Sequence, residues 1–451
     1  MNLSLSAFRP RLSALCLVSA VCLLGAVAHA QIAANIVRAR ISGIDVIAYQ
    51  TGVRDVVTFR GSLPAGDSLA PPNNLAIPTL VGGMLDKGTT TEDKFAIAQK
   101  LDAVGAELSF AVDSTTVTFS GKCLRKDMPL VIGLLAEQLR SPAFSEEEFA
   151  KLKKQTAGSL QRALENTGYR AGQAFAEAVY PPGHPNYIPT TEAFLAALDT
   201  ATVADLRAFH AKYYGPAALT VVAVGDLDVE DLKAEIAKAF AGWTGGVAKP
   251  VYPKATPTDA DRDQSVFMPD KPNVSVIIGQ TSGLKYSDPD AISLRIATTI
   301  LGSGFTGRLM ATVRDKEGLT YGIGSKLTND TFADGDWRIV ANFAPSLLEQ
   351  GLASTRRELK AWYEQGVTPA ELARTKTNLS GSFKVSLATT DGLANAILAT
   401  VHRGYDLSWL DEYPQKLDAV TLDQVNAAIK KHLNPDNMVL IKAGTVPTAA
   451  K

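Results

Sequence analysis

Cysteine is scarce in this sequence, and two of the three cysteines lie in a segment that we expect to be removed. Cys16 and Cys22 fall within the first thirty residues, so the mature chain would keep only Cys123. One cysteine can form neither an internal disulfide nor a thiolate cluster for a metal. Because Cys123 lies in an alternating, strand-like run, we predict an inert, half-buried thiol.

Histidine is also scarce, and its positions are scattered. Beyond residue 30 the chain has only His184, His210, His402 and His432. No two of them stand four positions apart, and none has the glutamate neighbour that a zinc-binding helix needs. The alternative is that the four converge from distant segments. The sequence therefore predicts no catalytic zinc in this chain.

Neither sign of charge is in excess. The chain has 45 lysines and arginines against 46 acidic residues, a net charge of -1. Losing the first thirty residues would remove two arginines and no acid, which leaves -3. This balance argues against nucleic acid or an anionic membrane surface as a partner. The apolar content of 46% is enough for two full cores.

A long apolar run occurs at the N-terminus, over residues 12–27. Arg9 and Arg11 precede it, and Ala28-His29-Ala30 follows it as a cleavage signal. We interpret residues 1–30 as a secretory signal peptide, which predicts a bacterial periplasmic protein with no membrane span after cleavage. The alternative, a membrane anchor, is disfavoured because the run is short and no stop-transfer pattern follows. No cysteine follows the run, which disfavours a lipoprotein.

The rest of the chain repeats one pattern of strands followed by helices. Its final strands begin at Leu219 and Met438, and long helices open at Ser145 and Thr368. Equivalent elements are thus 219 and 223 residues apart, which indicates a duplicated α+β unit rather than a chance likeness of two domains. We predict domains over residues 31–245 and 265–447, joined by a linker over 246–264.

Several short runs occur in order along both halves of the chain. They are Met84-Leu-Asp-Lys-Gly-Thr89, Ser141-Pro-Ala-Phe144, His184-Pro-Asn-Tyr187, Tyr213-Tyr-Gly-Pro216, Val224-Gly-Asp226, Leu301-Gly-Ser-Gly-Phe-Thr-Gly-Arg-Leu309 and Arg314-Asp-Lys-Glu-Gly-Leu-Thr-Tyr321. In this order and spacing they resemble the family of pitrilysin, insulin-degrading enzyme and the mitochondrial processing peptidases. The likeness covers nearly all of the chain beyond residue 30.

The resemblance implies two tandem homologous α+β domains, each an antiparallel-rich sheet covered by helices, forming half of a peptidase clamshell. Family members bind zinc through H-x-x-E-H on a helix directly before the Met-Leu-x-Lys-Gly-Thr run. Here Thr79 and Gly83 stand at the histidine positions and Gly82 at the glutamate position. A third ligand would fall near Ser159 or Leu160, so the zinc motif is degenerate throughout.

Arg314 and Tyr321 match an arginine and a tyrosine that complete the family's site opposite the zinc. The resemblance implies that Tyr321 donates to the scissile carbonyl oxygen as it becomes an oxyanion, while Arg314 holds a substrate carbonyl. The local sequence alone leaves a simpler alternative open. An arginine near a helix C-terminus is favoured by the helix dipole, and a tyrosine suits a half-buried strand.

Glycines flank this pair. Gly302, Gly304 and Gly307 fit the dinucleotide fingerprint G-x-G-x-x-G, but a predicted helix precedes them where the fingerprint needs a strand. We therefore expect no NAD, and interpret Gly302 and Gly304, with Gly322 after the tyrosine, as positions where a substrate backbone passes closely.

Together these features predict the non-zinc subunit of a periplasmic heterodimeric zinc peptidase, inactive alone. Its partner would be a homologous H-x-x-E-H chain that carries the zinc, and its substrates would be peptides. The alternative is a catalytically silent scaffold or peptide-binding member of the same fold. A third hypothesis, an independently active peptidase, predicts about one zinc per chain.

Overall fold

The structure is a computed structural model that describes residues 31–256, 258 and 261–446. The predicted signal peptide, residues 1–30, lies outside the described residues. No helix in the described part of the chain is both long and apolar enough to cross a membrane.

The first half is built on a six-stranded sheet with the strand order β1-β2-β6-β3-β5-β4. Only β2 and β6 run parallel; the other neighbours are antiparallel. The strands are β1 (Ile36–Ile41), β2 (Ile44–Gln50), β3 (Val56–Leu63), β4 (Glu107–Val112), β5 (Val117–Leu124) and β6 (Thr220–Gly225).

Eight helices accompany this sheet in the described residues. They are α1 (Ile77–Met84), α2 (Lys94–Val104), α3 (Met128–Arg140), α4 (Glu146–Leu164), α5 (Thr167–Val179), α6 (Thr191–Thr200), α7 (Val203–Tyr213) and α8 (Val229–Ala239). Local signals set their ends. Ser145 caps α4 by accepting from the Glu148 N–H, and Gly105 ends α2 at a φ of 63°, where a glycine is favoured.

The second half repeats the sheet without an equivalent of β1. Its order is β7-β11-β8-β10-β9, with β7 and β11 parallel and the other neighbours antiparallel. The strands are β7 (Asp263–Phe267), β8 (Val274–Thr281), β9 (Ile323–Thr328), β10 (Asp336–Phe343) and β11 (Val439–Gly444). The same neighbours in the same directions confirm the predicted α+β class with two tandem domains.

The helices of the second half follow the same plan. They are α9 (Ala291–Gly302), α10 (Leu348–Gln365), α11 (Pro369–Ser386), α12 (Thr390–His402), α13 (Trp409–Ala419) and α14 (Leu422–His432). A π-helix spans Met310–Lys316, where the sequence predicts an ordinary helix over residues 307–316. The short strands β1 and β7 and the helix α13 were not predicted. Because β7 begins at Asp263, the predicted linker overlaps its first two residues.

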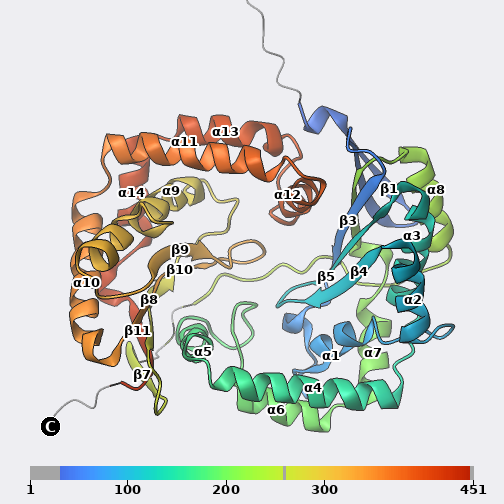
Figure 1. Ribbon diagram of the computed structural model, residues 1–451, viewed down its shortest axis with the longest axis horizontal. Coiled ribbons are helices and arrows are strands. Elements are labelled where there is room, and N and C mark those ends of the chain that lie inside the picture. The colour runs from blue at the N-terminus through green and yellow to red at the C-terminus, as the bar shows by residue number, and fades with distance from the viewer. Residues whose placement is uncertain (1–30, 257, 259–260, 447–451) are drawn as a thin grey trace, which may run out of the picture. The chain divides into compact units, whose positions relative to one another are not determined.

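Each half contributes one helix that packs on the sheet of the other half. Helix α5 packs against β8 and β11, and α12 packs against β3 and β6 (Figure 1). The two exchanged helices are also anchored alike. Thr167 Oγ1 lies 2.8 Å from Ser275 Oγ on β8, and Thr390 Oγ1 lies 2.8 Å from Thr58 Oγ1 on β3. The helices begin 223 residues apart, so the exchange obeys the internal repeat.

This exchange explains why the central strands are apolar on both faces. On β6, Val221 and Ala223 belong to the core of the first half, while Val222 and Val224 pack with Ile397 and its neighbours on α12. Side chains alternate along a strand, so a continuous apolar run requires cover on both sides. The cover of one face therefore comes from the other half of the chain.

We expect the halves to depend on each other for stability. Residues 31–245 and 246–451, co-expressed as separate chains, should co-purify in equal amounts. Each piece alone should bind the apolar dye ANS and aggregate, because an exchanged helix and a sheet face would both lose their cover. Size-exclusion chromatography and dye binding measure this. A monomeric, cooperatively unfolding 31–245 fragment would contradict the expectation.

Candidate functional site

The segment from Arg314 to Tyr321 leaves the π-helix and turns toward β9. Gly318 has a φ of 66°, a left-handed conformation that suits glycine and ends the helix. Thr320 then fixes the chain to β10, because its hydroxyl donates to the Asn342 carbonyl at 2.6 Å and accepts from the Gly322 N–H at 3.1 Å. The residue between these two anchors is Tyr321.

Tyr321 points into solvent rather than into a sheet face. It is 93% exposed, and among the described residues its hydroxyl makes no hydrogen bond. The strand β9 begins two residues later, at Ile323. The simpler alternative, a half-buried strand tyrosine, is therefore wrong.

The structure brings Arg314 and Tyr321 together and adds a third residue, Phe305. The Arg314 guanidinium carbon lies 5.9 Å from the centre of the Tyr321 ring and 5.4 Å from the centre of the Phe305 ring. Both distances are within the range of cation–π attraction. Its Nη1 also donates to Asp315 Oδ1 at 3.0 Å. Phe305 is 72% exposed and lies in the glycine-rich loop, so an aromatic residue amid glycines was the signal that sequence reasoning missed.

The three glycines predicted to bind substrate differ in their surroundings. A Cβ on Gly302 would lie 2.4 Å from the Ser325 backbone nitrogen, so this glycine is needed for close packing of α9 on β9. Gly304, at a φ of 66°, and Gly322 have no heavy atom within 4 Å of the Cβ position. Their backbones are open to another molecule, and their role in substrate binding stays a prediction. As predicted, a helix (α9) precedes the loop.

The degenerate zinc positions Thr79, Gly82 and Gly83 lie on α1, which packs against α4, the helix of Ser159 and Leu160. At the first position, the Thr79 hydroxyl donates to Asp67 Oδ1 at 2.7 Å. Burial raises the pKa of Asp67 to about 6, although the bond from Thr79 opposes the shift. One partly buried carboxyl with a threonine partner does not make a zinc site.

Apolar side chains occupy the space beside the two glycines. A Cβ on Gly82 would lie 2.1 Å from Val112 Cγ2 on β4, and one on Gly83 would lie 3.0 Å from Leu152 Cδ2 on α4. A glutamate at position 82 would therefore displace Val112. Apolar side chains thus occupy the space that the side chains of the motif would need.

The histidines are occupied elsewhere, each by a separate partner. Their contacts are His184 with Asp334, His210 with the Leu139 carbonyl, His402 with Ser62 and His432 with Asp290. Over the described ranges, no three histidine, cysteine, aspartate or glutamate side chains are grouped so that they could hold a metal ion. Cys123 is fully rather than half buried, and burial raises its pKa to about 12, which keeps the thiol protonated.

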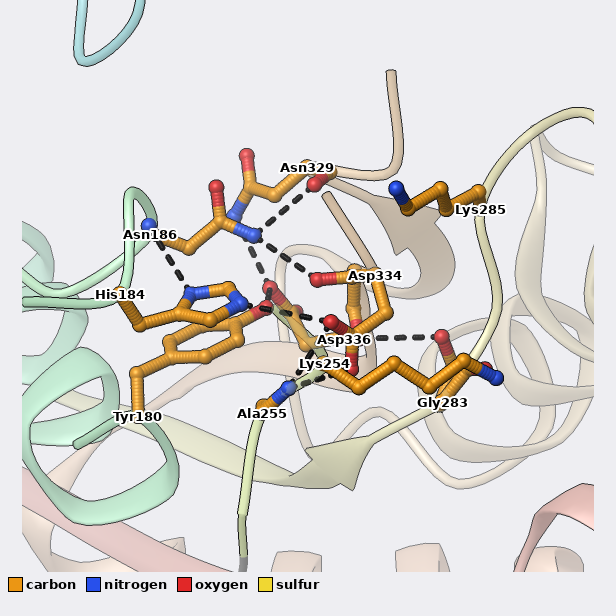
Figure 2. Close-up of polar contacts among 12 residues, drawn as sticks. Tyr180, His184, Asn186, Lys254, Ala255, Gly283, Lys285, Asn329, Asp334 and Asp336 are labelled. Carbon is orange, nitrogen blue, oxygen red and sulfur yellow. Dashed lines mark hydrogen bonds and ion pairs between the residues drawn. The ribbon is translucent and has the colours of Figure 1, made fainter. Parts of the chain in front are cut away.

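A buried polar network joins the two halves beside α5 (Figure 2). His184 Nε2 lies 3.3 Å from Asp334 Oδ1, and the Tyr180 hydroxyl donates to Asp336 Oδ2 at 2.9 Å. Asn186 adds bonds to the carbonyls of Asn329 and Asp334. The His184-Pro-Asn-Tyr187 run of the resemblance thus has a structural task. It fixes the loop after α5 to the turn between β9 and β10.

Comparisons with known proteins agree with this fold. The model described as Insulinase (Peptidase family M16) matches residues 47–181, and the one described as Peptidase M16 inactive domain matches residues 200–379. The chain thus has two tandem α+β domains, and each half matches a model of the same peptidase family. The chain belongs to the M16 family, the insulinase family that its sequence resembles.

Some relatives of this chain are named proteases, and another is named a non-peptidase homolog. An uncharacterized zinc protease of Streptomyces coelicolor is 27% identical over 77% of this chain and 76% of its own length. The non-peptidase homolog YmxG of Helicobacter pylori is 24% identical over 83% and 85%.

A crystal structure of a peptidase M16 inactive domain from Pseudomonas fluorescens is similar to this chain. It superposes with a TM-score of 0.85 at 26% identity, over 92% of this chain and 99% of that one. The periplasmic protease PqqL of Escherichia coli shares the fold, with a TM-score of 0.77 at 17% identity, over 92% of this chain and 46% of that one.

Rebuilding the zinc motif should fail because of the filled space. The triple variant Thr79→His, Gly82→Glu, Gly83→His should bind no stoichiometric zinc and should lose about 1–3 kcal/mol of stability at each overpacked position. Metal analysis and thermal unfolding measure both effects. Thr79→His alone is the control, since it adds no side chain beside Val112. One zinc per chain at an unchanged Tm would show that the space is available.

The buried pair His184–Asp334 should matter more than the partly exposed pair His432–Asp290. His184→Ala should cost about 2–4 kcal/mol in urea unfolding, because it leaves the Asp334 carboxylate buried without that partner. His432→Ala is the matched control. Its partner Asp290 keeps Lys431 at 2.7 Å and is partly exposed, so less than about 1 kcal/mol should be lost. Equal losses would refute a stabilising role for the network.

Proposed function

We propose that this chain is the non-zinc subunit of a periplasmic, heterodimeric zinc peptidase that cleaves or processes peptides. The observation that carries the proposal is a contrast within one chain. Apolar side chains occupy the space beside the degenerate zinc positions on α1, whereas Arg314 and Tyr321 lie together and are accessible to solvent. The hydrogen bonds of Thr320 and Gly322 hold Tyr321 with its hydroxyl in solvent. This exposed position is expected for a residue that binds substrate, and packing alone does not explain it.

The geometry of the pair supports a division of roles. The Tyr321 hydroxyl is free to donate to an oxyanion, and Arg314, steadied by the ring of Phe305, can donate to a peptide carbonyl. The zinc and the water that attacks the peptide would come from a homologous partner chain with H-x-x-E-H. Gly304 and Gly322 would let the substrate backbone approach.

The peptide itself would bind by strand addition. Strand β9 pairs only with β10 among the described strands, so its other edge is available for backbone hydrogen bonds near Tyr321. Export to the periplasm rests on the predicted signal peptide. N-terminal sequencing of the periplasmic protein should start at Gln31.

Reconstitution tests the catalytic role. Mixed with its zinc-bearing partner, the Tyr321→Phe chain should show about 100-fold lower kcat/KM for peptide cleavage, the usual effect of losing one oxyanion donor worth about 3 kcal/mol. Tyr363→Phe, which removes a hydroxyl from α10, is the control and should cleave normally.

Arg314→Ala should also slow cleavage, and Arg314→Lys should restore part of the rate through its charge. Equal activity of the wild type and the Arg314→Ala, Tyr321→Phe double variant would refute the role. A stable chain that binds peptides, recovers no zinc-bearing partner and supports no cleavage would instead identify a silent scaffold.

A further inference from the structure

A cavity of about 290 Å³ lies away from Arg314 and Tyr321. It is lined by the first sheet, the linker, the turn between β9 and β10, and the end of α12. The lining residues that matter here are Arg40, Ser62, Lys249, Phe332 and His402. None of them belongs to the degenerate zinc positions or to the Arg314–Tyr321 segment.

Two cations line this cavity without an acidic partner. Lys249 Nζ donates to the His402 carbonyl at 2.7 Å, and Arg40 Nη2 donates to the Ala217 carbonyl at 3.0 Å. Within the described part of the chain, neither makes an ion pair. The one carboxylate of the lining, Asp45, is held by both arms of Arg38 at 2.9 and 2.7 Å. The cavity therefore has positive groups with unused donors.

His402 adds no charge to the cavity. Its Nε2 lies 2.6 Å from Ser62 Oγ, and its ring centre lies 4.9 Å from that of Phe332. Burial and then the nearby Lys249 lower the pKa of His402 to about 4, so the ring is neutral near pH 7. Ser62 and His402 are thus neutral hydrogen-bonding groups beside two cations.

Lys249 carries a positive charge that no acidic side chain of the described residues pairs with. Its ammonium lies 4.9 Å from the centre of the Phe332 ring, and burial followed by repulsion from Lys285 lowers its pKa. The Lys249 side chain stays exposed, and an ammonium that bonds only a carbonyl and a ring gains a charge-assisted hydrogen bond when an anion reaches it. After its bond to His402, two of its three protons remain available.

We propose that this cavity binds a carboxylate group, held by Lys249 and Arg40, with Ser62 as a neutral donor whose oxygen accepts from His402 Nε2–H and whose own proton is thereby left for the anion. A singly charged anion fits better than a phosphate dianion, because Asp45 lines the cavity and Asp113 also acts on His402. The Ser62–His402 pair is assigned to binding, not to nucleophilic attack. In the described residues, no carboxylate is bonded to the other ring nitrogen of His402, as an oriented base would require.

The carboxylate can belong to a free small acid or to the C-terminus of a peptide. Isothermal titration calorimetry on the isolated chain, without any zinc-bearing partner, separates these sources. The probes are acetate, the tripeptide Ala-Ala-Ala, its C-terminal amide and inorganic phosphate. Binding of acetate alone identifies a free acid, and binding of the tripeptide acid identifies a peptide C-terminus. The amide should not bind.

Lys249→Met should weaken binding at least tenfold, since it removes the charge and keeps most of the stem. Lys254→Met is the matched control and should bind like the wild type. Lys254 lies in the same linker and also donates to a carbonyl, that of Gly283 at 3.2 Å, but it does not line the cavity. Arg40→Gln is the second variant, used if Lys249→Met fails to fold, and should also weaken binding.

Four outcomes would overturn the proposal. They are no binding of any acid, equal binding of acid and amide, unchanged affinity in the folded Lys249→Met or Arg40→Gln chain, and tighter binding of phosphate than of the carboxylates. None of them bears on peptide cleavage with the partner chain. The cavity and the proposed catalytic role therefore stand or fall separately.

Discussion

The exchange of α5 and α12 is the interaction on which the rest of the structure depends. Each central strand is buried on both faces, and for each sheet one of the covers belongs to the other half. Burying a side chain such as Ile397 or Phe175 fully contributes about 1.5–3 kcal/mol. The same contacts also fix the registers of α5 and α12, because Thr167 and Thr390 meet hydroxyls on the facing strands. Two domains that are separate in sequence are thus interdependent in stability.

At the degenerate zinc positions of α1, the packing differs as well as the residue types. Val112 and Leu152 lie where side chains on Gly82 and Gly83 would have to go, so the filled space and the glycines support each other. The second half shows the opposite arrangement. There a tyrosine and a phenylalanine stay exposed around an arginine, at a place where burying them would have been favourable. In the first half, apolar side chains occupy the space beside α1. In the second half, Phe305, Arg314 and Tyr321 form a polar and aromatic surface that is accessible to solvent.

Much of this could be predicted from the sequence, and the failures share a cause. The duplicated α+β plan follows from apolar periods and helix caps such as Ser145, and the absence of a zinc motif follows from reading residues. The sequence could not show that Val222 and Val224 face α12, because that contact joins segments about 170 residues apart. It also could not show that Phe305 meets Arg314, since their proximity depends on how α9 and the π-helix are joined. Tyr321 was placed on a strand, and only the bonds of Thr320 and Gly322 show that it precedes one.

Polar contacts between the halves are what an exchange of helices makes necessary. The loop after α5 places His184 against Asp334, and the last residue of α12, His402, meets Ser62. Buried polar groups are bonded as a rule, and the loop after α5 and the last residue of α12 each place a histidine against a partner in the opposite half. The two junctions nevertheless differ. The network near His184 contains the ion pair of Asp336 with Arg338, whereas near His402 neither Lys249 nor Arg40 makes an ion pair within the described residues. If the contacts of His184 and of His402 with the opposite half only stabilised the duplicated fold, both places should have paired charges. The unpaired cations near His402 are therefore the observation that the proposed anion would account for.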